Sequence, residues 1–156
     1  MQRFPAAVED VVGLYCDPAF YPHLDGLGKI GRPEVVDRSV DGSSIRMQVR
    51  FRFTADLPSA ALAVVHPDRL TWIEDTTYDL DAATSATVIR PDHYADRLAA
   101  TARSAFAPDG EGTSRKVTGE LKVRALLVGG QVERAIVDGM REHLHEEAAV
   151  VARLLG

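Results

Sequence analysis

Two side chains near the end of the chain have the spacing of an acid–base pair. His143 and Glu147 are four positions apart, and side chains at this spacing face each other across one turn of an α-helix. A carboxylate beside an imidazole can orient the ring for proton transfer. The same spacing is also common among solvated pairs on helix surfaces. The sequence favours a solvated or helix-flank pair over a catalytic one.

No complete metal or cofactor motif accompanies this pair. A zinc site needs three or four ligands, and no third ligand is placed by spacing beside His143 and Glu147. His145 and Glu146 begin an HExxH pattern, but Ala149 stands where its second histidine belongs. The sequence also lacks a glycine-rich phosphate loop, a serine elbow and a cysteine-centred motif. We therefore expect no metal ion and no cofactor, and we assign no catalytic residue.

A second group of residues has the chemistry of an apolar ligand site. Trp72 and Tyr78 combine an apolar body with a polar tip, which suits an amphipathic ligand. Met140 lies on a helical stripe, and methionine adapts to irregular apolar partners. Plain core packing is the alternative at each position. The predicted ligand-binding residues are Met47, Phe51, Phe53, Trp72, Tyr78, Met140, His143 and Leu144.

These side chains need a sheet to position them. Residues 45–54 alternate apolar and polar side chains, which is typical of an antiparallel strand with one buried face. Arg46, Arg50 and Arg52 lie on the polar face, where we expect carboxylates or water as partners. The Asp41-Gly42 pair predicts a hairpin turn before this strand. Further strands are predicted around Val35 and at 70–80, 85–90, 98–106 and 114–126.

The predicted ligand-binding side chains also need one long helix to position them. Residues 131–155 carry an apolar stripe at helical spacing, formed by Val132, Ile136, Met140, Leu144, Ala148, Val151 and Leu155. Gly139 interrupts this helix at a cost of about 1 kcal/mol relative to alanine, which suggests a close approach of the backbone to a strand or to a ligand, and we favour the strand. Shorter helices are predicted after Pro5, at 18–24 with Asp17 as the N-cap, and at 60–65.

Composition limits the possible classes of protein. The chain has 156 residues, 46% of them apolar, and 18 basic against 23 acidic residues give a net charge of −5. A disordered chain would be less apolar, and a nucleic-acid-binding protein would be more basic. No stretch is long enough to span a membrane, and we expect no signal peptide. Cys16 is the only cysteine, so no internal disulfide can form and we expect the reducing cytoplasm. The length, and the lack of a run of Pro, Gly or Ser that could be a linker, predict one domain over residues 1–156.

Several short motifs mark the fold. The order of elements resembles the helix-grip fold of the START-like superfamily, also called SRPBCC or Bet v 1-like, and within it an actinobacterial family of unknown function. The resemblance implies an α+β fold in which a curved antiparallel sheet wraps around the long C-terminal helix and leaves a cavity. It rests on Phe4-Pro5-Ala6-Ala7, Asp17-Pro18-Ala19-Phe20-Tyr21, Leu57-Pro58, Leu70-Thr71-Trp72, Gly112-Thr113, Gly119-Glu120-Leu121-Lys122-Val123-Arg124, residues 127–133, and Glu147 in the final helix.

The resemblance also implies a function. Members of the superfamily bind hydrophobic molecules such as lipids, sterols or polyketides, so we expect a carrier or sensor for a hydrophobic small molecule. The alternative is an enzyme of cyclase or hydrolase type that uses His143, Glu147, Tyr78 or Glu74 as acid or base. A third hypothesis is a filled core that acts through protein contacts. The sequence leaves the ligand and the oligomeric state open.

Overall fold

The architecture is a curved antiparallel sheet and a long helix. The computed structural model describes residues 1–156 except 55, 58, 64 and 125–128, and at 60 and 61 it describes the backbone alone. In this part of the chain seven strands form one sheet in the order β1-β7-β6-β5-β4-β3-β2. The strands are β1 (Gln2–Phe4), β2 (Glu34–Asp41), β3 (Ser44–Arg52), β4 (Thr71–Asp79), β5 (Thr84–Pro91), β6 (Leu98–Asp109) and β7 (Gly112–Val123).

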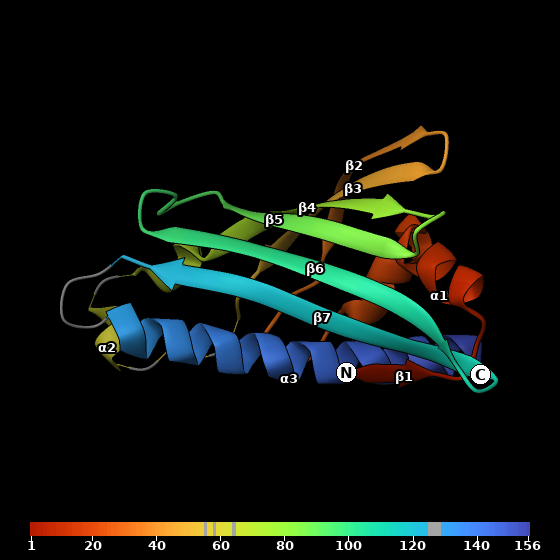
Figure 1. Cartoon of the computed structure of the whole chain (residues 1–156). Helices are drawn as coiled ribbons and strands as arrows, with labels where there is room; N and C mark the ends of the chain where they lie inside the picture. Colours follow the sequence, from red (N-terminus) through yellow and green to blue (C-terminus); the bar gives the residue numbers. More distant parts are fainter. Residues whose placement is uncertain (55, 58, 64, 125–128) are drawn as a thin grey trace.

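The helices cover the concave side of the sheet. Figure 1 shows the sheet arching over α3 (Gly129–Leu155), which packs against β1 and β7 and contacts α1 (Val8–Tyr15) and α2 (Ser59–Leu62). Two 3₁₀-helices, η1 (Pro18–Leu24) and η2 (Pro67–Arg69), complete the described helical segments. The Asp17 carboxylate accepts a hydrogen bond from the Ala19 amide at 2.8 Å, which confirms the predicted cap. The predicted helix-grip fold is confirmed.

Most predicted boundaries agree with the structure to within a few residues. The long helix begins at Gly129, two residues before the predicted start. The turn at Gly42 has a positive φ of 57°, which favours glycine and links β2 to β3. Residue 64 of the predicted short helix and residues 125–126 of the predicted last strand lie outside the described part of the chain.

Strand register sorts the side chains between the two faces. Ile45 pairs with Tyr78 and Phe51 with Trp72, so Trp72 and Tyr78 share the concave face with the apolar residues of β3. On the convex face Arg46 Nε donates to the Asp75 carboxylate at 2.7 Å. Arg50 Nε lies 3.3 Å from the Asp92 carboxylate. The expected carboxylate partners are therefore present at these two arginines.

The tightly packed core lies toward the C-terminal end of α3. Its fully covered side chains come from α1, η1, β3 and the last turns of α3, and the aromatic rings among them contact one another edge-on. The largest are Phe20, Leu24, Met47, Val11 and Val151.

The apolar stripe predicted for the long helix is confirmed only in part. Its members Val132 and Val151 are buried, whereas Met140 and Leu144 are only partly buried, and Glu147 and Val150, which were not assigned to the stripe, are buried.

Successive steps of four residues overshoot a helical turn by about 40° each, so the stripe has drifted from the inner face by Ala148. Met140, which lies seven residues or nearly two turns before the buried Glu147, stays on that face. A step of four residues from His143 to Glu147, followed by a step of three to Val150, makes nearly two full turns. These three residues therefore stay on the inner face.

The close approach predicted at Gly139 is also absent. A Cβ added at Gly139 would meet only the Lys29 side chain, at 3.8 Å, which is ordinary van der Waals contact. The glycine is not required there by any described strand.

Candidate functional site

Small side chains occupy the middle of the concave face. Across four neighbouring strands Thr76 pairs with Thr87, Thr87 with Ala102, and Ala102 with Gly119. The hydroxyls of Thr76 and Thr87 lie 2.9 Å apart. These side chains are shorter than those of β3 on the same face, such as Met47 and Phe51.

Inward-facing residues around this row keep accessible surface. Trp72 and Glu74 on β4, Leu121 on β7, and Ile136 and Met140 on α3 are only partly buried. Glu74 is surrounded by protein, yet part of its surface stays open. This combination is typical of a side chain that lines an internal space.

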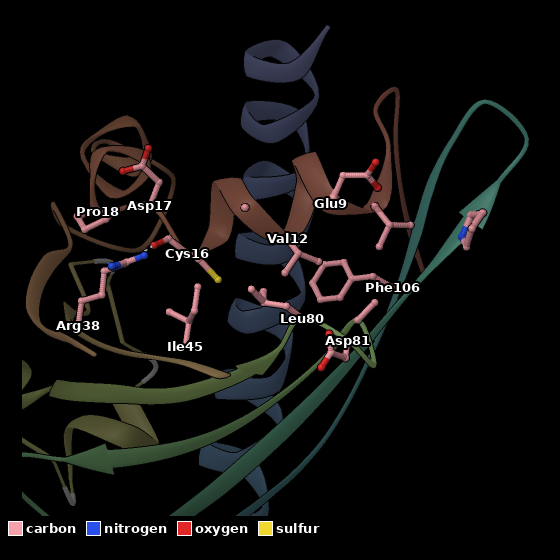
Figure 2. A pocket seen from close by; sticks show the side chains of 14 residues that line it. Glu9, Val12, Cys16, Asp17, Pro18, Arg38, Ile45, Leu80, Asp81 and Phe106 are labelled. Atoms are coloured by element: carbon pink, nitrogen blue, oxygen red, sulfur yellow. Dashed lines mark hydrogen bonds between the residues drawn. The ribbon is translucent and has the colours of Figure 1, made fainter. Parts of the chain in front are cut away.

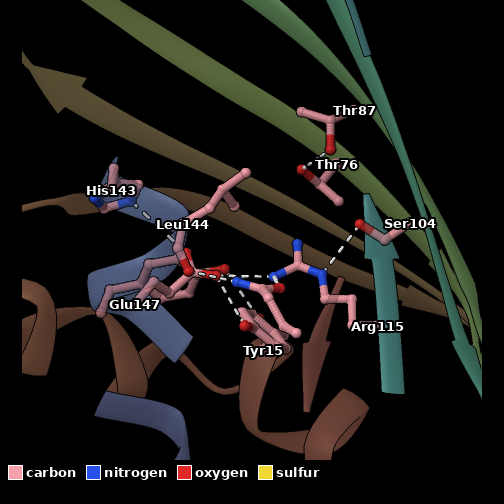
Figure 3. A network of polar contacts seen from close by, with 10 residues as sticks. Tyr15, Thr76, Thr87, Ser104, Arg115, His143, Leu144 and Glu147 are labelled. Atoms are coloured by element: carbon pink, nitrogen blue, oxygen red, sulfur yellow. Dashed lines mark hydrogen bonds and ion pairs between the residues drawn. The ribbon is translucent and has the colours of Figure 1, made fainter. Parts of the chain in front are cut away.

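A buried ion pair lies at the deep end of this surface. Arg115 on β7 donates to Glu147 on α3, with 2.8 Å between Arg115 Nη1 and Glu147 Oε1. The Tyr15 hydroxyl donates to the same oxygen at 2.8 Å. Figure 3 shows these side chains converging from the sheet, from α3 and from α1. The Glu147 carboxylate is therefore neutralised and hydrogen-bonded, as a buried charge requires.

Further contacts fix the arginine. Arg115 Nε lies 3.2 Å from the Ser104 hydroxyl, and Nη1 lies 3.4 Å from the Gln2 side-chain oxygen. The guanidinium also lies 4.4 Å from the centre of the Tyr15 ring. Burial opposes the charged form of Arg115, but Tyr15 and Glu147 outweigh it and raise its pKa above the usual value. Burial, with Glu147 adding to it, raises the pKa of Tyr15.

His143 lies beside this pair, inside the protein. Its Nε2 is 3.7 Å from Glu147 Oε2, and the two side chains are 12% and 11% exposed. The solvated or helix-flank pair favoured by the sequence is therefore wrong. The His143 ring contacts Phe51 edge-on, with 6.1 Å between ring centres. Its Nδ1 is buried and has no hydrogen-bond partner among the described residues.

Glu74 is the second carboxylate of the inner surface. The Trp72 indole nitrogen donates to Glu74 Oε1 at 3.3 Å. Burial raises the pKa of Glu74, while His143 and the Trp72 hydrogen bond oppose this rise. Burial likewise raises the pKa of Tyr78 well above its usual value. Glu74 and Tyr78 are therefore two titratable groups of β4 whose neutral forms are favoured by burial.

The predicted ligand-binding residues fall into two groups. Met47, Phe51 and Tyr78 are buried within the packed core. The others, which are partly buried, are Phe53, Trp72, Met140, His143 and Leu144. Their role in binding stays a prediction.

Sequence reasoning missed Tyr15, Ser104 and Arg115. The sequence does contain a signal for Arg115. It lies two positions from Thr113 and from Val117, and therefore on the same inward face of β7. An inward-pointing arginine needs an acidic partner, and Glu147 is the carboxylate that it contacts.

A separate pocket of about 770 Å³ lies between α1 and the ends of the strands (Figure 2). Its floor is apolar, while Glu9, Asp17, Asp81 and Arg38 lie around it. None of the predicted ligand-binding residues lines this pocket. Its apolar lining includes Val12, Ile45, Leu80, Ala83 and Phe106.

Neither a metal cluster nor a membrane-spanning helix occurs in the described part of the chain. There, no three His, Cys, Asp or Glu side chains are grouped so that they could hold a metal ion. No helix in the same residues combines the length and the hydropathy needed to cross a bilayer.

Solved structures share this fold at low sequence identity. TTHA0849 from Thermus thermophilus is 19% identical with a TM-score of 0.68, and the match covers 99% of this chain and 96% of that one. A START superfamily protein from Mycobacterium smegmatis is 17% identical with a TM-score of 0.59, covering 97% and 94% of the two chains. The di-domain ARO/CYC protein StfQ from the steffimycin biosynthetic pathway is 17% identical with a TM-score of 0.57, covering 97% of this chain and 43% of that one.

The match to a sequence family extends over nearly the whole chain. No curated protein matches the sequence at a significant level. The model of the family described as "Protein of unknown function (DUF2505)" matches residues 1–155. The chain therefore belongs to the DUF2505 family and has the START-like helix-grip fold.

Proposed function

We propose that this protein binds a hydrophobic or amphipathic small molecule between the sheet and the N-terminal half of α3. One observation carries the proposal. Trp72 and Leu121, which lie at inward register positions of the sheet, and Met140 on α3 are only partly buried. A protein with a filled interior would cover them.

The physical drive for binding is the removal of this apolar surface from water. Each square ångström of apolar surface covered contributes about 25 cal/mol before ordering costs. Glu74 and His143 give the same surface a polar end. An apolar surface with a few polar groups is the usual composition of a small-molecule site.

The structural neighbours support the same proposal. The fold is shared with a START superfamily protein and with an ARO/CYC protein of a biosynthetic pathway. A fold that serves in a biosynthetic pathway is compatible with a small organic ligand.

The experiment separates the inner surface from the α1 pocket. Nile red, an uncharged apolar dye, is titrated into the parent protein and into two variants that fill one space each. Met140→Trp adds bulk beside the inner surface. Gly13→Leu adds bulk in the α1 pocket, where a Cβ at Gly13 meets nothing within 4 Å.

We expect Met140→Trp to weaken dye binding about tenfold or more and Gly13→Leu to leave it unchanged. The reverse pattern would move the site to the α1 pocket. Failure of the parent protein to bind the dye, or of both variants to change binding, would contradict the proposal.

A second candidate function rests on the grouping of Glu74, His143 and Glu147. Acid–base chemistry needs a proton donor and acceptor of different pKa at one place, and Glu74 and His143 interact electrostatically. Hydrolysis of p-nitrophenyl butyrate that is lost in His143→Gln, while Nile red binding is retained, would favour an enzyme of hydrolase type. Hydrolysis that persists in His143→Gln would exclude His143 as the acid or base.

A further inference from the structure

We propose that the pocket beside α1 is a second binding site, which takes a small organic cation with an apolar body, such as an alkylammonium ion. The site lies outside the inner surface, so this inference does not rest on the proposed function. It follows from the apolar floor of the pocket, from a glycine that keeps the pocket open, and from two carboxylates at its edge that have no partner among the described residues.

The pocket has the size and the lining of a small-molecule site. Its volume of about 770 Å³ lies within the usual range for such sites. Apart from four charged residues, its lining consists of Gly13 and apolar side chains such as Val12, Ile45 and Phe106. Leu80, another of these side chains, is 41% exposed. An apolar ligand would remove this surface from water, which favours binding.

Gly13 keeps one wall of the pocket low. It lies inside α1, where glycine is less favourable than alanine. A Cβ at this position would meet nothing within 4 Å, and the φ of Gly13 is not positive. Neither packing nor backbone conformation therefore requires a glycine here. Its missing side chain leaves open the space that a ligand would occupy.

The charges of the pocket lining are mostly negative. The lining contains the carboxylates of Glu9, Asp17 and Asp81 and one guanidinium, that of Arg38. Figure 2 shows Arg38 and Asp17 on one side of the pocket, and Glu9 and Asp81 on the other side, where Phe106 lies. On this second side a cation meets opposite charges only.

Two of the carboxylates are open to a cation. Glu9 and Asp81 are exposed, and neither makes a hydrogen bond or an ion pair with a described residue. Asp17 differs, because its Oδ1 caps the helix η1. Arg3, a cation on β1, is held by Asp109 at 2.9 Å. A bound ammonium ion would therefore supply the charge that Glu9 and Asp81 lack.

An anion is the alternative ligand, because the terminal nitrogens of Arg38 have no partner among the described residues. Arg38 Nε donates to the Cys16 carbonyl oxygen at 2.9 Å, which fixes the side chain beside the pocket. The other charges of the lining are all negative, however, and they repel an anion. With three carboxylates against one guanidinium, the lining favours a cation.

The test compares two ligands that have the same alkyl chain and opposite charges. Decylammonium and decanoate are titrated into the parent protein by isothermal titration calorimetry at about pH 7.5, where both are ionised. The ratio of their dissociation constants reports which charge is favoured. The same titrations of Met140→Trp, which adds bulk beside the inner surface, detect any contribution of that surface.

Three further variants test the pocket itself. Gly13→Leu fills it. Glu9→Gln/Asp81→Asn removes both open carboxylates. Its matched control is Glu120→Gln/Asp138→Asn, which removes two exposed carboxylates on β7 and α3 that do not line the pocket.

We expect the parent protein to bind decylammonium about tenfold or more tightly than decanoate. Gly13→Leu should weaken decylammonium binding about tenfold or more, because it removes the apolar contact. Glu9→Gln/Asp81→Asn should weaken it about threefold or more, since exposed charge pairs contribute modestly. The control pair and Met140→Trp should leave the affinity unchanged. Added salt should weaken binding to the parent protein more than binding to Glu9→Gln/Asp81→Asn, because salt screens exposed charges.

Four results would overturn the inference. Decylammonium fails to bind the parent protein, or binds no more tightly than decanoate. Alternatively, its affinity stays unchanged in Gly13→Leu or in Glu9→Gln/Asp81→Asn. Thermal unfolding checks that each variant is folded, and if Gly13→Leu is less stable than the parent protein, Glu9→Gln/Asp81→Asn decides the question. Nile red binding is measured separately, so this inference and the proposed function can fail independently.

Discussion

The two halves of α3 face different interiors. On the C-terminal side of Glu147, Val150 and Val151 are buried against α1 and η1, whereas Met140 and Leu144 on its N-terminal side are only partly buried. The same helix therefore packs tightly at one end and leaves accessible surface at the other. This contrast shows that stability and the candidate binding surface can be assigned to separate stretches of one element.

The difference follows from the side chains opposite each half. The C-terminal half meets aromatic rings, with Tyr15 and Phe20 only 5.3 Å apart between ring centres. The N-terminal half shares the concave face with the short side chains of Thr87 and Ala102. The ion pair of Arg115 and Glu147 lies where the packed region begins on α3.

The largest expected effect comes from breaking that ion pair. Arg115→Met should reduce the free energy of unfolding by about 3–5 kcal/mol, because it leaves the buried Glu147 carboxylate without a cation. Urea denaturation followed by circular dichroism measures this change. The double variant Arg115→Met/Glu147→Leu should recover much of the loss, and a double variant no more stable than the single one would show that charge is not the cause.

A matched pair of leucines compares the packed core, at Leu24 of η1, with the partly buried side of α3, at Leu144. Leu24 has no exposed surface, so Leu24→Ala should cost about 2–5 kcal/mol. Leu144 is partly exposed, and Leu144→Ala should cost about 1 kcal/mol, as expected for a partly buried residue. The same denaturation measurement applies to both. Equal losses would contradict the contrast between the packed core at Leu24 and the partly exposed surface at Leu144.

The burial of Glu74 on β4 predicts that the free energy of unfolding depends on pH. Its pKa is raised in the folded protein by burial, so the folded state binds this proton more tightly than the unfolded chain. The stabilisation is complete below the ordinary glutamate pKa of about 4.3 and is lost as pH rises through the folded pKa. Glu74→Gln, which does not titrate, should therefore gain stability relative to the parent protein across this window.

The difference between the two denaturation curves isolates Glu74 from other carboxylates. Asp75 on the opposite face has the reverse sign, since its hydrogen bond from Arg46 lowers its pKa. Its contribution is the same in both proteins and cancels. The free energy of unfolding is compared between the parent protein and Glu74→Gln from about pH 4 to about pH 8, a range that starts near the ordinary glutamate pKa. A difference that stays constant over this range would contradict a raised pKa for Glu74.

The smallest expected effect lies at Gly139. A Cβ there meets only Lys29 at 3.8 Å, so Gly139→Ala should stabilise the protein by about 0.5–1 kcal/mol through helix propensity. Gly119→Ala is the contrasting control, because its Cβ would lie 2.8 Å from the Thr101 carbonyl oxygen. It should destabilise the protein, and thermal unfolding distinguishes the two signs.

The fold could be predicted from the sequence because its signals are local. Alternation at 45–54 and the helical period at 131–155 report backbone geometry directly, and both elements are present as β3 and α3. Turn residues such as Gly42 indicate where one strand ends and the next begins.

The candidate site could be predicted only in part, because it depends on contacts between distant residues. Arg115 and Tyr15 are separated from Glu147 by 32 and 132 positions, and no local pattern joins them. The predicted stripe through Met140 and Leu144 also ignored the rotation of successive four-residue steps. As a result His143 and Glu147, which lie inside, were assigned to the surface.

The position of the ion pair along α3 also has a mechanical consequence. Contacts from α1, β1 and β7 converge on the helix near Glu147 and Leu144, whereas α3 extends back from there to Gly129. That part forms a lever arm of roughly 27 Å at 1.5 Å per residue. A pivot of about 6° at the anchor displaces its tip by about 3 Å. Such a pivot would move the start of α3 relative to the sheet by about the size of a methyl group while the contacts near Glu147 are kept.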